Sequence, residues 1–157
     1  IIGCGGAARA IAMTLADQGM KKILLTNRTA AKAEALATEI NTRITPCADV
    51  IPMTSSAIAT ALKHSQLLVN TTSVGMHPQE TQSPIEADLL LPDLVVADIV
   101  YNPRETLLLK NARRMGCRVV PGLGMLIYQG AAAFRLWTGR DPLVAEMFVA
   151  AEAALAP

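Results

Sequence analysis

The sequence predicts an α/β fold in which a doubly wound parallel sheet of about six strands is followed by two C-terminal helices. Three observations support this prediction. Short apolar runs that suit buried strands alternate with helical patterns along most of the chain. A glycine-rich segment joins the first apolar residues directly to the first helical pattern. The 157 residues, 52% of them hydrophobic, are enough for one domain with a sizeable core.

Residues 1–8 are typical of a dinucleotide-binding turn between a strand and a helix. Gly3 would allow a tight turn, Gly5 would leave backbone N–H groups open to a pyrophosphate, and Ala8 would permit close packing of helix and strand. The helix that follows would direct the positive end of its dipole at the phosphates. Glycine-rich turns also form for purely steric reasons, so the motif depends on its context.

The next elements supply that context. A helical pattern covers residues 7–18, and Gly19 stands where a left-handed C-terminal cap is expected. Residues 22–26 form a short apolar run that suits a strand buried on both faces. The sequence therefore predicts a strand–helix–strand unit around the glycine motif.

The segment Asn27-Arg28-Thr29 follows this second strand, where NAD-binding domains commonly carry an acid for the ribose 2′-hydroxyl. No acid is present, and Arg28 would instead pair with a 2′-phosphate, which favours NADP over NAD. Thr29 is a plausible N-cap for a helix over residues 30–40, and Lys32 would add a second cation. The alternative is that Arg28 and Lys32 are ordinary solvated charges.

The middle of the chain has weaker patterns. We expect a third strand at residues 50–53 and a short helix at 56–63. A fourth strand at 67–70 runs into a polar segment at 70–76, which would face the ligand crevice at the carboxyl ends of the strands. Turn chemistry alone would give a similar composition.

The second half repeats the alternation of strands and helices. Residues 77–92, with three prolines, predict a loop with one turn of helix. The most strand-like run covers residues 94–101, so Tyr101 would project into the same crevice. A helix at 106–115 and a sixth strand at 117–120 follow.

Two helices are expected at the C-terminal end. Gly122 and Gly124 would bring the backbone close to a neighbour before a helix that carries Gln129, and Asp141 would cap a last helix through residue 155. We expect residues 1–121 to form a cofactor-binding domain whose first strand is truncated. The chain opens inside a strand, so we expect an N-terminal substrate and catalytic domain to be missing from it. Residues 122–157 would pack back toward that domain.

Composition excludes several kinds of partner. Fourteen basic and 13 acidic residues give no electrostatic case for nucleic acid or an anionic membrane surface. Cys4, Cys47 and Cys117 lack metal-ligand spacing, so no metal site is predicted, and they suit reduced thiols. No signal peptide or run of 18 apolar residues occurs, and we expect a cytoplasmic protein.

Four segments together resemble the shikimate dehydrogenase family: residues 3–8 with 27–29, then 70–76, 98–103 and 122–129. The resemblance runs the full length and corresponds to the family's NADP-binding C-terminal half. It implies a Rossmann-like domain with NADPH as cofactor and reversible reduction of 3-dehydroshikimate to shikimate, in the biosynthesis of chorismate and aromatic amino acids. A monomer or homodimer is expected.

The resemblance also implies a set of site residues. The cofactor would be bound by Gly3, Gly5, Gly6, Ala7, Asn27, Arg28, Thr29, Lys32, Thr72, Ile99 and Gly122. The substrate would be reached by Tyr101 and Gln129. The family's catalytic lysine and aspartate belong to the missing N-terminal domain, so no catalytic residue is expected in this chain. One departure is Thr71, where the family usually has alanine.

Other interpretations remain open. A quinate/shikimate dehydrogenase, or another NADP-dependent reductase related to glutamyl-tRNA reductase, would carry similar motifs. A non-catalytic cofactor-binding or regulatory module is a candidate of a different class, because the catalytic half is not in this sequence.

Overall fold

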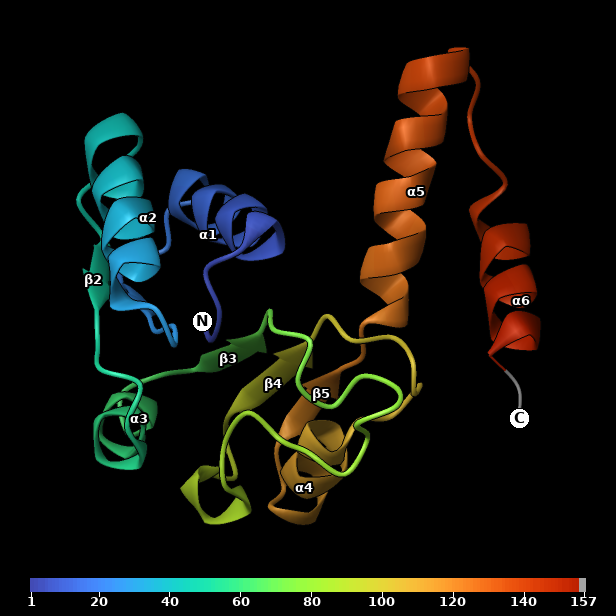
Figure 1. Ribbon diagram of the computed structural model, residues 1–157. Helices are drawn as coiled ribbons and strands as arrows, with labels where there is room; N and C mark the ends of the chain where they lie inside the picture. The colour runs from blue at the N-terminus through green and yellow to red at the C-terminus, as the bar shows by residue number, and fades with distance from the viewer. Residues whose placement is uncertain (156–157) are drawn as a thin grey trace.

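The computed structural model describes residues 1–155 and shows an α/β fold with parallel strands (Figure 1). The strands are β1 (Ile23–Leu25), β2 (Ala48–Val50), β3 (Leu67–Asn70), β4 (Val95–Asp98) and β5 (Arg118–Val120). Strand β1 pairs with β2, and β4 lies between β3 and β5 in a second sheet. The α/β class and the parallel pairing are therefore confirmed.

Ile2 connects the two sheets. It forms single-residue parallel bridges to Thr26, which follows β1, and to Asn70 at the end of β3. Across the molecule the order is thus β2, β1, Ile2, β3, β4, β5. The prediction of one sheet with about six strands is not confirmed, because the apolar pair before Gly3 is too short to form a strand of its own.

Helices cover both faces of this arrangement (Figure 1). They are α1 (Gly6–Asp17), α2 (Ala30–Arg43), α3 (Ser55–Leu62), the 3-10 turn η1 (Ala87–Leu89), α4 (Leu107–Arg114), α5 (Leu123–Thr138) and α6 (Val144–Ala154). Helices α1 and α2 share one apolar cluster with β1 and β2. Helices α3 and α4 share a second cluster with β3 and β4. The small buried residues Ala8, Ala12 and Ala16 let α1 approach the strands closely.

Two boundaries differ from the sequence prediction. Strand β2 begins at Ala48 and ends at Val50, so the strand predicted at 50–53 was placed too late. Pro52 has no N–H group for a ladder, and Asn41 fixes the start of β2 by pairing with both backbone groups of Ala48, at 2.7 and 2.8 Å. The predicted strand at 94–101 ends earlier, at Asp98.

The last two helices stand apart from the sheet and pack against each other (Figure 1). Their contact includes an edge-to-face pair of Tyr128 and Phe148, with ring centroids 5.8 Å apart. Helix α6 buries none of its residues. The predicted cap at Asp141 is wrong: α6 begins at Val144, and the Asp141 carboxylate instead pairs with the Arg135 guanidinium at 3.2 Å.

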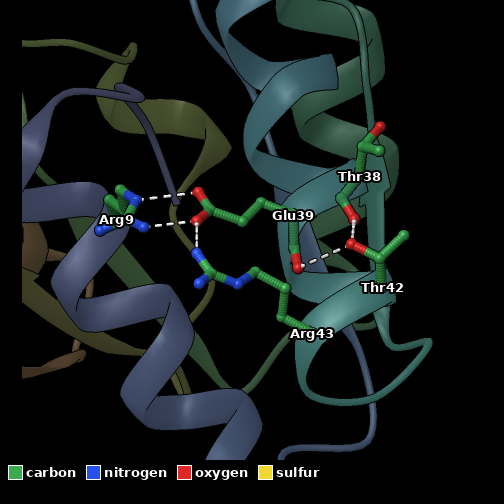
Figure 2. A network of polar contacts seen from close by, with 5 residues as sticks. All are labelled: Arg9, Thr38, Glu39, Thr42 and Arg43. Carbon is green, nitrogen blue, oxygen red and sulfur yellow. Dashed lines mark hydrogen bonds and ion pairs between the residues drawn. The ribbon is translucent and has the colours of Figure 1, made fainter.

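A charged cluster ties α1 to α2, as Figure 2 shows. Both carboxylate oxygens of Glu39 accept hydrogen bonds from Arg9, and one of them also accepts from Arg43 at 2.6 Å. The hydrogen bonds from Arg9 and then Arg43 lower the pKa of Glu39 to about 2. The carboxylate therefore stays ionised in the folded chain well below the usual range for glutamate.

Replacing Glu39 with glutamine is expected to lower the free energy of unfolding at pH 7, with the difference fading in acid. The pKa of Glu39 is about 2 in the folded chain against an ordinary value of 4.5. Its stabilising contribution is therefore complete above the ordinary value and is lost as the pH falls toward 2. Urea denaturation from pH 7 to pH 2.5 measures the effect, with Glu34→Gln on the same helix as the control. A difference that is as large at pH 2.5 as at pH 7 contradicts the prediction.

Candidate functional site

The glycine turn lies at the carboxyl edge of the strands, directly after Ile2. Gly3 is buried and has a φ of +96°, which favours glycine. A Cβ at Gly3 would lie 2.6 Å from Thr71 Oγ1. Thr71 donates its hydroxyl to the Ile2 carbonyl oxygen at 2.8 Å, so this threonine ties the end of β3 to the turn.

The next glycines face open space. Gly5 and Gly6 are exposed, and a Cβ at either would meet no atom within 4 Å. Gly5 is the N-cap of α1 and provides no side-chain capping bond, so the first N–H groups of the helix have no partner within it. Ala7 is half-buried and Ala8 fully buried beneath them. An exposed helix N-terminus without a capping side chain fits a diphosphate.

The loop after β1 lies next to this turn. The Gly3 N–H donates to the Thr26 carbonyl at 2.9 Å, and Asn27 Nδ2 donates to the Thr29 carbonyl at 2.9 Å. Thr29 is the N-cap of α2, as predicted, although its side chain makes no capping bond. Arg28 and Lys32 are exposed, and neither forms an ion pair within residues 1–155. Within those residues, neither cation is therefore neutralised by an ion pair.

A buried polar network lies at the ends of β3 and β4. Asp98 is only 2% exposed, yet its carboxylate has three donors. Oδ1 accepts from Asn70 Nδ2 at 2.9 Å and from the Val100 N–H at 3.0 Å, while Oδ2 accepts from the Thr106 hydroxyl at 2.7 Å. Burial raises the pKa of Asp98, and these hydrogen bonds, that of Thr106 first, oppose the shift.

Sequence reasoning missed Asp98. Residues 94–101 were predicted as a strand, and Asp98 was counted only within segment 98–103 of the resemblance, with no role of its own, although an acid inside such an apolar run is itself unusual. A buried acid needs donors, and the asparagine that ends β3 and the threonine that caps α4 were available in the sequence.

The remaining predicted residues lie around this network. Thr72 and Ile99 are half-buried, and Tyr101 is 39% exposed just beyond β4. A Cβ at Gly122 would lie 2.5 Å from the carbonyl oxygens of both Ile99 and Val100. The start of α5 therefore presses directly on the backbone that leads to Tyr101.

Gln129 makes its side-chain hydrogen bond within α5. It is exposed on α5, and its Nε2 donates to the Leu126 carbonyl of the same helix at 3.0 Å. Within the described part of the chain no hydrogen bond joins Gln129 to Tyr101.

Two other features bear on the chemistry. Residues 1–155 contain no group of three or more His, Cys, Asp or Glu side chains that would hold a metal ion. Across the same residues, no helix has the length and apolar character needed to span a bilayer. The groups that the carboxyl edge of the strands does offer to a ligand are backbone N–H donors, two cations and polar side chains.

Comparison with known proteins gives consistent results. The family described as shikimate / quinate 5-dehydrogenase matches residues 1–103, and the shikimate 5'-dehydrogenase C-terminal domain matches residues 122–147. A shikimate dehydrogenase (NADP(+)) from Moorella thermoacetica is 46% identical over 147 residues, which cover 94% of this chain and 50% of that protein. The chain spans about half the length of the curated relatives that it matches.

Solved structures agree with this match. A shikimate dehydrogenase in complex with NADP+ superposes with a TM-score of 0.89 and 38% identity, over 99% of this chain and 54% of that one. Quinate dehydrogenase from Corynebacterium glutamicum in complex with NAD has a TM-score of 0.86 and 34% identity, over 94% and 51% of the two chains. The two matched regions, the identity and the shared fold all point one way: the chain belongs to the shikimate / quinate 5-dehydrogenase family.

Proposed function

We propose that this chain binds NADP(H) across the carboxyl edge of its strands and is the cofactor-binding part of a shikimate dehydrogenase. One observation carries the proposal. The bridge between Ile2 and Thr26 sets the loop that bears Arg28 beside a glycine turn that is open to solvent. Relatives named as NADP(+) enzymes and a related structure in complex with NADP+ support it.

Each part of the edge has a role in this proposal. The backbone N–H groups of Gly5, Gly6 and Ala7, at the N-terminal end of α1, bind the pyrophosphate, and Gly3 keeps the turn tight. Arg28 and Lys32, with the polar side chains of Asn27 and Thr29, bind the 2′-phosphate. The nicotinamide side is lined by Thr72, Ile99 and Gly122.

The proposed reaction is reversible hydride transfer between NADPH and 3-dehydroshikimate, giving shikimate. The bound nicotinamide supplies the hydride. The hydroxyl of Tyr101 and the amide of Gln129 hydrogen-bond the cyclic substrate and orient it at the mouth of the crevice. A lysine and an aspartate from an N-terminal domain complete the reaction, and no residue of this chain takes their place.

The C-terminal helices support such a two-domain arrangement. Helix α6 buries no residue, and Trp137 and Leu136 of α5 are 85% and 84% exposed. Large apolar side chains that are this exposed mark interaction surfaces in soluble proteins. In our proposal residues 1–121 form the cofactor domain, and α5 and α6 pack against the substrate domain.

Titration of the chain with NADPH and NADH tests the proposal. We expect NADPH to bind at least about tenfold more tightly, because only NADPH carries the 2′-phosphate that Arg28 would pair with. Lowering the salt concentration is expected to widen the gap, since exposed cations are screened by salt. Equal affinities, or no binding of either cofactor, would reject the proposal.

A quinate/shikimate dehydrogenase is the second candidate, favoured by the similarity to quinate dehydrogenase. Quinate, the additional substrate of such an enzyme, carries a hydroxyl that shikimate lacks, on the ring carbon that bears the carboxylate. Turnover of quinate and shikimate by the complete enzyme distinguishes the two. The absence of an acid at residues 27–29 favours the NADP-linked form over one that uses NAD.

A further inference from the structure

The network at the ends of β3 and β4 is fully enclosed and fully paired. Asn70 and Thr106 have no exposed surface, and Asp98 has almost none. Thr106 donates to Asp98 and at the same time accepts from the Leu109 N–H at 3.3 Å, which caps α4. A carboxylate in such a place is costly unless donors surround it, and here three do.

The network extends from Asp98 into the proposed crevice. Asn70 Oδ1 accepts from the Thr72 N–H at 3.0 Å and from the Thr72 hydroxyl at 2.7 Å. The Thr72 hydroxyl oxygen in turn accepts from the Val74 N–H at 3.2 Å. The conformation of residues 70–74 is therefore set by hydrogen bonds that begin at Asp98.

The Asp98 carboxylate also holds residues 99–101, the second segment that lines the proposed crevice. It accepts from the Val100 N–H, which fixes the backbone between Ile99 and Tyr101. The Ile99 N–H also donates to the Asn70 carbonyl at 3.1 Å. Both segments that line the proposed nicotinamide side are thus joined to one buried group.

The adenosine side is built differently. There the Gly3 N–H donates a hydrogen bond to the Thr26 carbonyl and holds the turn. The Asn27 side chain donates to the Thr29 carbonyl and holds the loop. None of these contacts passes through Asp98. Residues 70–74 do contact the turn through Thr71, whose N–H and hydroxyl both donate to the Ile2 carbonyl at 2.8 Å, whereas the loop that bears Arg28 is held by Asn27. A change at Asp98 would therefore act first on the nicotinamide half and leave the loop that bears Arg28 in place.

We infer that Asp98 is a positioning residue for the nicotinamide half of the cofactor site. Its carboxylate sets residues 70–74 and 99–101 relative to each other, with Thr106 fixing the carboxylate. This inference rests on the proposed binding of NADP(H), and it adds a residue that contacts neither cofactor nor substrate.

The test measures how tightly the Asp98→Asn variant binds two different ligands. Adenosine 2′,5′-bisphosphate carries the 2′-phosphate but lacks the nicotinamide half, whereas NADP+ has both. Asparagine keeps the shape but replaces the charged carboxylate with a neutral amide that has one acceptor oxygen in place of two, so the hydrogen bonds from Asn70, Val100 and Thr106 lose their charge assistance. We expect the affinity for NADP+ to fall about tenfold and that for the bisphosphate to change by less than about twofold.

Two further variants keep the test decisive if Asp98→Asn does not fold. Thr106→Val keeps the side-chain shape but removes the hydroxyl donor, and we expect the same selective loss of NADP+ affinity. Thr106→Ser keeps the hydroxyl and should retain the wild-type ratio of the two affinities. Thermal unfolding of each variant accompanies the titrations.

The outcomes separate this inference from the proposed function. If the unchanged chain binds neither ligand, the proposed function fails and the inference fails with it. If the unchanged chain binds both, an equal loss for the two ligands, or no loss for either, overturns the positioning role alone. A loss confined to NADP+ in Asp98→Asn or Thr106→Val, restored in Thr106→Ser, establishes it.

Discussion

Replacing Arg28 with alanine is expected to weaken NADPH binding about thirtyfold and to leave NADH binding unchanged. A charge-assisted pair with a phosphate contributes about 2 kcal/mol, which corresponds to this factor. Arg28 is exposed and has no ion-pair partner in residues 1–155, so its loss should remove little folding stability. NADH has no 2′-phosphate and loses nothing. Calorimetric titration of both cofactors at fixed salt measures the two constants.

Two variants in α2, the helix that follows Arg28, serve for comparison. Lys32→Ala removes a point charge that cannot bind a phosphate bidentately, and a loss of about threefold is expected. Arg43 is at the far end of α2 and pairs with Glu39 at 2.6 Å, so Arg43→Ala should leave both affinities unchanged. Equal losses of NADPH and NADH in Arg28→Ala would show that the residue acts on the fold and not on the phosphate.

Local pattern was sufficient for most of the fold. The strand predicted at 67–70 matches β3, and the helix predicted at 7–18 differs from α1 by one residue at each end. In both, a residue at the end of the pattern favours its termination: Asn70 is the last residue of β3, and Gly19, at φ +83°, lies just after the C-cap of α1. Where the residue pattern of an element and the residue that ends it agree, the bounds of the element can be predicted without knowledge of its tertiary contacts.

The errors arose where a side-chain contact outside the predicted element decided the outcome. Asn41 fixes the start of β2 through its side chain, and no periodicity in residues 48–53 reveals that contact. Arg135 similarly draws the Asp141 carboxylate away from the start of α6. Local propensity is a weak guide when such a tertiary contact competes with it.

The site was predictable as a set of segments but not as a set of contacts. The glycine turn and residues 27–29 were identified because each carries its chemistry within a few residues. The role inferred for Asp98 depends on Asn70 and Thr106, which lie 28 and 8 positions away. Only the folded chain brings these three together.

Gly122→Ala is expected to destabilise the chain by about 3 kcal/mol, at the upper end of the usual cost of overpacking. The φ of Gly122 is −70°, which any residue adopts, so the effect is one of space. An added Cβ would lie 2.5 Å from the carbonyl oxygens of Ile99 and Val100, and those are backbone atoms that cannot turn away. Either α5 or the end of β4 must move.

Gly124→Ala is the matched control, because it adds the same methyl group two residues along the same helix. A Cβ at Gly124 meets no atom within 4 Å. Alanine also favours the helix by up to about 1 kcal/mol, so this variant should be as stable as the unchanged chain or slightly more so. Urea denaturation of the two variants measures the difference. If Gly122→Ala and Gly124→Ala unfold at the same urea concentration, the close contact between α5 and the end of β4 does not exist in solution.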